Sequence, residues 1–412
     1  MKILLISCGG TIVSPPEEPG VKSAIVAPEP VVEKLINEIT PPPMIEFLNS
    51  RAMKKRSEFI SANAVDNGCY RDLMIHPPQS GHGKSKGSGS AIDWVVIFDM
   101  DSTEVGPLVW ENIINCIIDN YDKYDGFIVT HGTNTLAYTA SALTFGLPKI
   151  HKPVVITGSN NPFGLPFSDA IVNASNAVLL THTLISEGER GVMVVFASRI
   201  MPGTRTKKAS GRELEAFRTF NASDIGQMRP KEPVISNDEL RKYQANLIEG
   251  SPWFGQPLVS NARELKINAH TRFEGIISSH TFHPGDDPCT YIAVLDIIHK
   301  KRLSTGIRGA LIIRAVGDGD VSKAIQENVY QTAKDLEIPI VVTTQEPGGT
   351  SSLKSNDQSE GVEGKYGVIP AWDMSIETMV VKLRYLLSQR DYSYSNVKEK
   401  FIQNFHGEIR NR

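Results

Sequence analysis

The sequence predicts an α/β fold of two domains, each with a mainly parallel sheet flanked by helices. Three observations support this prediction. Short apolar runs alternate with helical segments over most of the chain, as parallel strands and their covering helices do. The alternation weakens once, from about 231 to 268, where polar residues dominate. At 412 residues the chain exceeds the length at which one hydrophobic core keeps growing.

These observations also place the domain boundaries. We expect an N-terminal domain at 1–236, a connecting segment at 237–269 and a C-terminal domain at 270–412. Two further stretches are expected to be loops. Residues 14–30 are rich in proline, and residues 76–90 combine Pro, Gly, Ser and Lys with almost nothing to bury, as in a flexible surface insertion.

The strands of the N-terminal domain are expected where apolar residues run without interruption, which is typical of a sheet buried on both faces. The expected strands are 1–6, 94–98, 126–130, 153–157 and 191–196. The segments between them have helical periodicity, clearest where Trp110, Ile113, Ile114 and Ile117 share one face. The expected helices are 108–121, 134–145 and 170–185.

The same alternation resumes in the C-terminal domain. Here the expected strands are 275–277, 309–313 and 339–343, and the expected helices are 291–299, 321–336 and 375–388. The chain shows no internal repeat and no long low-complexity tract. Both domains are therefore expected to be built on the same principle, strands joined by helices.

Composition excludes several classes of protein. The chain is 40% hydrophobic and 22% charged with a net charge of −3, so neither disorder nor a basic nucleic-acid surface is indicated. The four cysteines are scattered without the close pairs of zinc or redox sites, so we expect reduced thiols: Cys8, Cys69, Cys116 and Cys289. No cofactor, no metal, no nucleic acid and no membrane partner is expected.

The N-terminus predicts a cytoplasmic protein. The tetrapeptide from Leu5 to Cys8 superficially resembles a lipoprotein cleavage site, but only four residues precede it. A signal peptide needs an apolar region of about 7–15 residues. No run approaches the roughly 20 apolar residues that span a bilayer.

Two polar turns stand at the carboxyl ends of expected strands, where open α/β sheets bind their ligands. Gly9-Gly10-Thr11 follows the first strand, and His131-Gly132-Thr133-Asn134-Thr135 follows the strand at 126–130. Glycine lets the backbone approach a ligand closely, and threonine places a hydroxyl at the strand end. Each turn alone is better explained as an ordinary turn or helix cap.

Their combination with other polar strand ends favours a site. Asp101-Ser102-Thr103 follows the strand at 94–98, Ser168-Asp169 precedes a helix, and Lys207-Lys208 follows the strand at 191–196. Taken alone, a Lys-Lys pair is more often a solvated surface turn.

With these motifs the sequence resembles the bacterial-type asparaginase/glutaminase family. ILLISCGGTIV resembles the family's first signature, with Cys8 where threonine is usual and Val13 where a small residue is usual. GFIVTHGTNTLAYTASAL resembles the second signature, with Asn134 where the family has aspartate. Further similar segments extend to about Gln389: DMDSTEVGP, KPVVITGS, SDAIVNASNAV, TRTKKASGRELEAF, RGALIIRAVGDGD, PIVVTTQ and DMSIETMVVKLRYLL.

The resemblance implies a fold and a set of site residues. It implies a flavodoxin-like N-terminal domain, with Thr11 as the nucleophile that takes the acyl group. Thr133 and Lys208 would form a pair in which Lys208 holds or relays a proton, with Lys207 as the fallback. The substrate-binding residues implied are Gly10, Ser102, Thr103 and Asn134, of which Ser102 and Thr103 would hold the substrate's α-carboxylate.

This chemistry is coherent without a metal. An acyl-enzyme divides amide hydrolysis into two easier steps. Lysine can accept the threonine proton when burial lowers its pKa, and the N–H groups of the glycine loop can stabilise the oxyanion.

Two departures bear on the substrate. In the family the residue at position 134 is acidic and holds the substrate's α-ammonium group, whereas an amide keeps one acceptor oxygen and loses the charge. Either the substrate lacks a free ammonium, or another acid replaces the missing one, with Asp101, Glu104 and Asp169 as candidates, or the enzyme is weak. Residues 14–26 also contain no tyrosine, which asparaginases of the family commonly use there to support the nucleophile.

The sequence therefore predicts an asparaginase-type amidohydrolase that converts L-asparagine, or a related side-chain amide, to the acid and ammonia. Two alternatives stay open: an amidase for a modified or peptide-linked asparagine, and a catalytically weak ligand-binding protein on the same fold. The family's active sites lie between subunits, so the resemblance implies a homodimer or homotetramer. The turn 317–320 would then face a neighbouring subunit's site.

Overall fold

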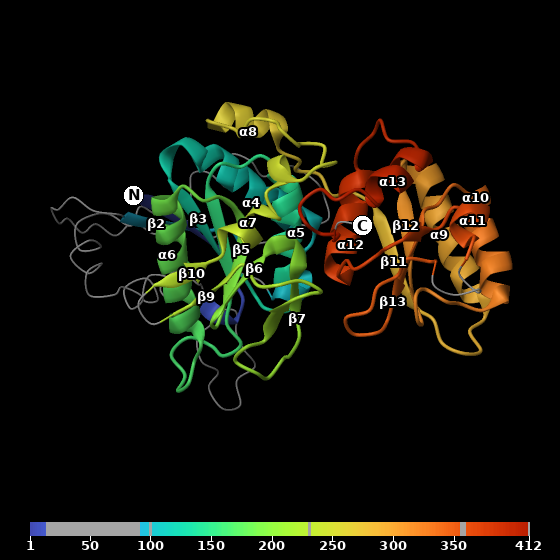
Figure 1. The fold of residues 1–412 in the computed structure, drawn as a ribbon, viewed down its shortest axis with the longest axis horizontal. Coiled ribbons are helices and arrows are strands. Elements are labelled where there is room, and N and C mark those ends of the chain that lie inside the picture. The colour runs from blue at the N-terminus through green and yellow to red at the C-terminus, as the bar shows by residue number, and fades with distance from the viewer. Residues whose placement is uncertain (14–90, 99–100, 230–231, 355–359, 411–412) are drawn as a thin grey trace. The chain divides into compact units, whose positions relative to one another are not determined.

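The computed structural model describes residues 1–13, 91–98, 101–229, 232–354 and 360–410 (Figure 1). The loops expected at 14–30 and 76–90 lie outside these ranges. The described chain forms two compact units. Unit 1 comprises Met1–Thr219, Ser223–Leu247 and Gly255–Thr271, and unit 2 comprises Phe220–Ala222, Ile248–Phe254 and Arg272–Arg412.

Unit 1 is built on an eight-stranded sheet with the order β10-β9-β6-β5-β4-β3-β1-β2. Five strands are parallel. They are β1 (Lys2–Ser7), β2 (Ala91–Val96), β3 (Gly126–Thr130), β4 (Pro153–Thr157) and β5 (Gly191–Phe196). Their order 2-1-3-4-5 is that of flavodoxin-like sheets. Three match the predicted runs, whereas β1 lies one residue later than the run at 1–6 and β2 begins before the run at 94–98 and ends at Val96.

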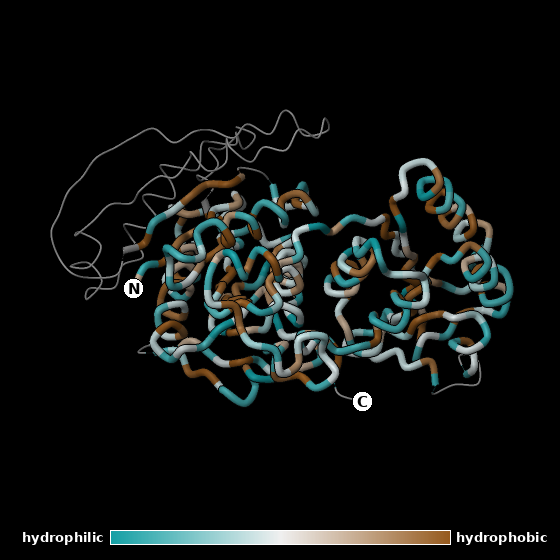
Figure 2. The backbone as a smooth tube through the Cα atoms, turned by 90° about the horizontal axis from the view of Figure 1, so that it is seen from above, coloured by the Kyte–Doolittle hydropathy of each residue, from teal (hydrophilic) through white to brown (hydrophobic). Residues whose placement is uncertain are grey.

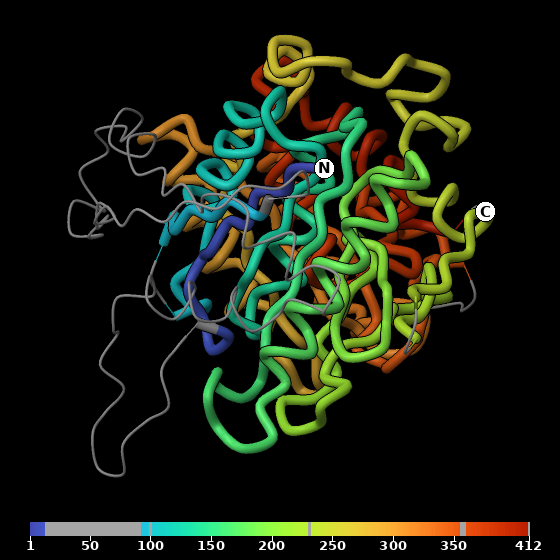
Figure 3. The backbone as a smooth tube through the Cα atoms, turned by 90° about the vertical axis from the view of Figure 1, so that its left-hand side faces the viewer, coloured from blue at the N-terminus to red at the C-terminus, as the bar shows by residue number. Residues whose placement is uncertain are grey.

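The remaining three strands extend this sheet on one side. They are β6 (Arg199–Pro202), β9 (Gly226–Met228) and β10 (Pro233–Ile235), and they pair antiparallel. A separate two-stranded ribbon consists of β7 (Thr206–Lys208) and β8 (Phe217–Thr219). In Figure 3 the N-terminal strand β1, drawn in blue, lies among the strands with which it pairs.

Helices cover the parallel strands. The helix α6 (Ala170–Glu187) packs against β3, β4 and β5, over a core that includes Ile3, Leu5 and Val155. The helix α5 (Leu136–Gly146) contacts β4 and β5, and α4 (Pro107–Asn120) packs against α5. All residues of β3 and β4 and all but the first of β1 are buried, as expected for strands between helices. Figure 2 shows brown, apolar stretches along the described chain.

Unit 2 has a four-stranded parallel sheet with the order β11-β12-β13-β14. The strands are β11 (Ile276–Thr281), β12 (Gly309–Ala315), β13 (Ile340–Thr344) and β14 (Ile369–Pro370). The helices are α9 (Pro288–Thr305), α10 (Gln331–Asp335), α11 (Val362–Tyr366), α12 (Ile376–Leu387) and α13 (Tyr394–Phe401), with a π-helical turn at Ile325–Tyr330 before α10. The predicted fold, two domains with mainly parallel sheets, is confirmed.

The segment 237–269, which we expected to connect the domains, is more structured than its sequence indicated. It contains α7 (Asn237–Arg241) and α8 (Ala262–Asn268). Apart from Ile248–Phe254 it belongs to unit 1. Side-chain caps explain why these short polar helices form: Ser236 accepts from the Glu239 amide and Asn261 from the Glu264 amide. Within the described residues, no helix combines the length and apolarity needed to cross a membrane.

Candidate active site

Three polar loops of unit 1 follow neighbouring strands. Gly9-Gly10-Thr11 follows β1, the turn η2 (Ser102–Glu104) follows β2, and His131–Thr135 follows β3. Because β2, β1 and β3 are adjacent and parallel, their carboxyl ends meet at one edge of the sheet. The strand order also reverses there, which is where α/β sheets form their ligand sites.

Glycine brings the three loops into contact. A Cβ atom added to Gly10 would lie 2.4 Å from the Gly132 nitrogen, and the backbone of Gly10 has a φ of +82°. A Cβ atom added to Gly132 would lie 2.6 Å from the Ser102 Cβ. Any larger residue at position 10 or 132 would therefore push the loops apart. Glycine at these two positions lets the loops approach each other.

The two threonines flank this glycine contact. Thr11 comes directly after Gly10 and begins a short 3-10 turn, and Thr133 comes directly after Gly132. Thr133 is buried and Thr11 is partly exposed. Since consecutive Cα atoms are about 3.8 Å apart, the backbones of Thr11 and Thr133 lie within one or two residues of this contact.

Lys208 forms a hydrogen bond with Thr133. Its Nζ donates to Thr133 Oγ1 at 2.7 Å and to Asn134 Oδ1 at 2.9 Å. Burial lowers the pKa of Lys208 below its ordinary value of 10.5. No described carboxylate forms an ion pair with this ammonium. Lys207, the fallback, is the preceding residue of the same strand, so its side chain points to the other face of β7.

Small residues on α5 allow Lys208 to reach the site. The turn from Gly203 to Arg205 before β7 packs directly on this helix. A Cβ atom added to Gly203 would lie 2.4 Å from Thr144 Oγ1, and Ser141 Oγ donates to the Gly203 carbonyl. The strand β7, which carries Lys208, also contacts α5, and this helix begins just after the His131–Thr135 loop.

The turn after β2 places Ser102 and Thr103 differently. Ser102 is buried against Gly132. Thr103 is exposed, and its amide and hydroxyl donate to Asp101 Oδ1 at 2.8 Å and 2.6 Å. These two bonds lower the pKa of the Asp101 carboxyl, which is therefore ionised at neutral pH. The donors of Thr103 are thus already used by Asp101, so binding a carboxylate there requires this turn to rearrange.

The three acids proposed to replace the missing carboxylate have different surroundings. Asp169 is buried and accepts hydrogen bonds from the amides of Asn160 and Asn161 and from Asn173 Nδ2. It therefore closes the loop after β4. Asp101 accepts the two hydrogen bonds from Thr103 within the turn after β2. Glu104 is exposed on the same turn.

Sequence reasoning did not assign a role to His131. Its Nδ1 lies 2.8 Å from the Gly132 carbonyl, and its Nε2 lies 2.9 Å from Thr139 Oγ1, which also accepts from Trp110 Nε1. Since a carbonyl only accepts, Nδ1 carries the proton and Thr139 donates to Nε2. Burial lowers the pKa of His131 to about 4, so the ring is neutral. The chain of bonds fixes the peptide that links Gly132 to Thr133.

Cys8 occupies the position where the family usually has threonine. The residue is buried, and its amide donates to the Thr130 carbonyl at the end of β3. Burial raises the pKa of its thiol, so the sulfur stays protonated and is a poor nucleophile. The structure therefore gives no reason to prefer Cys8 over the adjacent threonine loop. Among the described residues, no group of three or more His, Cys, Asp or Glu side chains is arranged to hold a metal.

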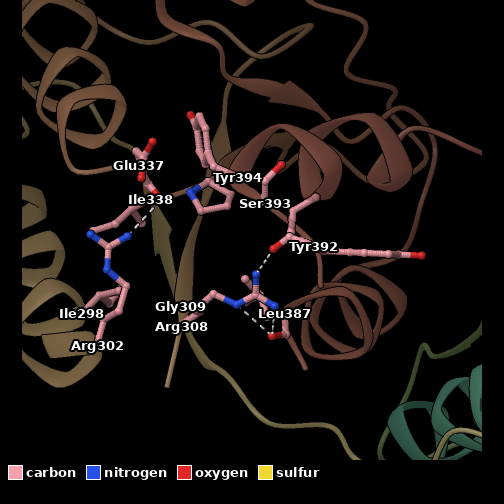
Figure 4. Close-up of a pocket in the computed structure, with 12 residues that line it drawn as sticks. Ile298, Arg302, Arg308, Gly309, Glu337, Ile338, Leu387, Tyr392, Ser393 and Tyr394 are labelled. Atoms are coloured by element: carbon pink, nitrogen blue, oxygen red, sulfur yellow. Dashed lines mark hydrogen bonds between the residues drawn. The ribbon is translucent and has the colours of Figure 1, made fainter. Parts of the chain in front are cut away.

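Unit 2 contains a cavity of about 190 Å³ (Figure 4). It lies at the amino ends of strands β12 and β13. Arg308 and Arg302 lie in its wall. The Arg308 guanidinium donates to the backbone carbonyls of Leu387, the last residue of α12, and of Gln389 and Tyr392, which follow the helix. Figure 4 shows the two arginines pointing apart, each toward backbone at the cavity wall. The Arg308 side chain thus serves to hold the backbone after α12. None of the sequence-predicted site residues lines the cavity.

The fold and this loop cluster define a class of protein: a two-domain α/β protein whose polar site lies where the strand order of the first sheet reverses. Comparison with known proteins identifies the family. The family model "Asparaginase, N-terminal" matches residues 2–241, and "Glutaminase/Asparaginase C-terminal domain" matches residues 278–401. The chain belongs to the asparaginase/glutaminase family, whose members are amidohydrolases.

Individual relatives agree with this assignment. The chain is 31% identical over 326 residues to an L-asparaginase of Thermococcus kodakarensis, covering 78% of this chain and 87% of the relative. It is 30% identical over 313 residues to L-asparaginase 1 of Escherichia coli, covering 75% and 82%. It is also 28% identical over 334 residues to a glutamyl-tRNA(Gln) amidotransferase component of Aeropyrum pernix, covering 78% and 70%.

Solved structures show the same fold. The thermostable L-asparaginase from Thermococcus kodakarensis matches with a TM-score of 0.71 at 26% identity, covering all of both chains. L-asparaginase I from Vibrio cholerae matches with a TM-score of 0.69 at 23% identity, covering 100% of this chain and 99% of the other.

Proposed function

We propose that this protein hydrolyses the side-chain amide of L-asparagine, or of a close relative, to the acid and ammonia through an acyl-enzyme on Thr11. The observation that supports this most is the bond from Lys208 Nζ to Thr133 Oγ1, directly beside the contact between Gly10 and Gly132. This arrangement brings Thr11, on the loop after β1, together with the proton-accepting pair of Thr133 and Lys208.

In the first step the Thr11 hydroxyl oxygen adds to the amide carbonyl carbon. Its proton passes by way of the Thr133 hydroxyl to Lys208, which accepts it when neutral. The lowered pKa of Lys208 increases its neutral fraction near neutral pH. The negative charge that forms on the carbonyl oxygen is stabilised by backbone N–H groups of the glycine loop.

In the second step the carbon–nitrogen bond breaks, and the nitrogen takes the proton back to leave as ammonia. The acyl group then remains on Thr11 as an ester. Water attacks this ester with the same base, the acid leaves, and the Thr11 hydroxyl is restored. All of these residues lie in unit 1.

The proposal is tested by measuring ammonia release from a panel of amides that contains L-asparagine, L-glutamine and acylated asparagine. Release from at least one asparagine-type amide supports it. Binding of such amides without any release would instead favour a ligand-binding protein on the same fold. The cytoplasmic location and the homo-oligomeric state stay predictions. Size-exclusion chromatography with light scattering checks the latter.

A further inference from the structure

The side chain of Asn134 has a fixed orientation in the site. Lys208 Nζ donates to its Oδ1 at 2.9 Å. In its protonated form Lys208 only donates hydrogen bonds, so the opposite amide orientation would place two donors against each other. The Asn134 Nδ2 group must therefore point away from Lys208. Asn134 is exposed, and no described residue accepts a hydrogen bond from its Nδ2.

Among the described residues, a ligand beside Asn134 therefore meets hydrogen-bond donors and, while Lys208 is protonated, a positive charge. Lys208 forms no ion pair with a described carboxylate. Asp169 is committed to the loop after β4, and Asp101 accepts from Thr103. An acceptor group on the ligand would pair with Nδ2, whereas an ammonium group would face a donor and the like charge of Lys208.

Asn134 is placed so that these donors and this charge can act on the substituents of the substrate's α-carbon. The reacting carbonyl must lie at the threonine loops, and Asn134 directly follows Thr133. In an asparagine-type substrate the α-carbon is only two bonds from the amide carbon. A group attached to that α-carbon is therefore within reach of a side chain one residue from Thr133.

We propose that Asn134 is a specificity-determining residue that selects side-chain amides whose α-substituent is neutral and accepts a hydrogen bond, such as an acylated α-nitrogen, over amides with a free α-ammonium. This inference rests on the proposed function and names the substrate class for the same site. In an N-acylated asparagine the acyl carbonyl accepts from Asn134 Nδ2, and the α-nitrogen carries no charge.

The test is a comparison of kcat/KM for three amides with the wild-type protein and Asn134→Asp. The amides are L-asparagine, N-acetyl-L-asparagine and succinamate, which keeps the carboxylate but has no α-nitrogen and so reports the general effect of the added charge. The wild-type protein should prefer N-acetyl-L-asparagine over L-asparagine by about tenfold or more. Asn134→Asp should raise kcat/KM for L-asparagine about tenfold and lower it for N-acetyl-L-asparagine by a similar factor, which is roughly 1.4 kcal/mol in each direction.

Asn261→Asp is the matched control, because it adds the same charge at a helix cap where aspartate serves equally well. It should leave the ratio of the two kcat/KM values unchanged. A wild-type preference for L-asparagine, or a ratio that Asn134→Asp shifts by less than about threefold, overturns the inference while leaving the proposed function in place. Ammonia release from none of the three amides by either protein overturns the proposed function and the inference with it.

Discussion

The two units of this protein both place polar residues at the carboxyl ends of a parallel sheet, but the described residues at these ends are paired differently. In unit 2 the loops after β11 and β12 are tied by their own side chains. Asp286 accepts from Tyr291 Oη at 2.6 Å and pairs with His283 at 3.1 Å. Asp318 accepts from the amide and hydroxyl of Ser352 at 2.6 Å and 2.7 Å.

In unit 1 the corresponding polar groups are not all paired with groups of opposite charge. The Lys208 ammonium donates to two neutral oxygens and meets no described carboxylate. Asn134 directs its amide nitrogen away from that lysine. Polar groups that satisfy one another build a loop, whereas groups left without a charge partner at a strand end are available for binding and catalysis. The difference between the units thus lies in the pairing of polar groups and not in the architecture.

The largest effect is expected from Thr11→Ala. If the site in unit 1 works through a threonine acyl-enzyme, this change removes the nucleophile and should lower kcat by at least about 10⁴-fold. The fold and most ligand binding should be retained, because only covalent chemistry is lost. Steady-state ammonia release checks the rate, and circular dichroism checks the fold. Retained turnover would move the nucleophile to Thr133.

Lys208→Met should have the next largest effect, a loss of about 10²–10⁴-fold in kcat. Because the neutral amine is the active form, wild-type kcat/KM should rise with pH toward the pKa of Lys208, which lies below 10.5, and the variant should lack that rise. The measurement is kcat/KM as a function of pH. Lys207→Met is the matched control and should change the rate by no more than a few fold, since residue 207 lies on the other face of β7. A larger loss of kcat in Lys207→Met than in Lys208→Met would assign the proton relay to Lys207 instead.

A change in unit 2 should affect stability and not chemistry. Lys382 Nζ and Glu408 Oε1 form a fully buried ion pair at 2.5 Å. Glu408→Gln leaves the lysine charge buried without its partner and should destabilise unit 2 by about 3–5 kcal/mol. Urea unfolding measures this loss, while kcat at a temperature where the protein stays folded should be unchanged.

The exposed pair of Lys300 and Asp296 provides the control for that experiment. Asp296→Asn should cost less than about 1 kcal/mol, because exposed ion pairs are screened by water. Equal effects of Glu408→Gln and Asp296→Asn would contradict the view that unit 2 uses buried polar pairs for structure.

The parallel strands were predictable from the sequence because strands buried on both faces are continuous apolar runs, as in β1 and β3. The antiparallel strands β9 and β10 were missed. Each has only three residues, and the central residue of each is exposed, so neither leaves a pattern that a sequence can reveal. The helix α7 had local signals in the cap residue Ser236 and in the acidic residues Asp238 and Glu239 of its first turn.

The candidate site shows a similar limit. The strand-end loops with Thr11 and Thr133 follow from the sequence, but the place of Lys208 came only from a resemblance. Its position depends on how closely the turn at Gly203 packs on α5, which is a tertiary contact. The bond from Trp110 to Thr139 likewise depends on the packing of α4 against α5, so the role of His131 was not visible beforehand.

The measurement that tests the central claim most directly is the detection of the acyl group on the enzyme. The protein is mixed with an amide that it hydrolyses and is quenched in acid within the first turnovers. It is then digested, and its peptides are mapped by mass spectrometry. The account predicts an added mass equal to the acyl group on the peptide that contains Thr11, and none in Thr11→Ala. An adduct on the peptide that contains Thr133, or ammonia release with no adduct on any peptide at any quench time, would contradict it.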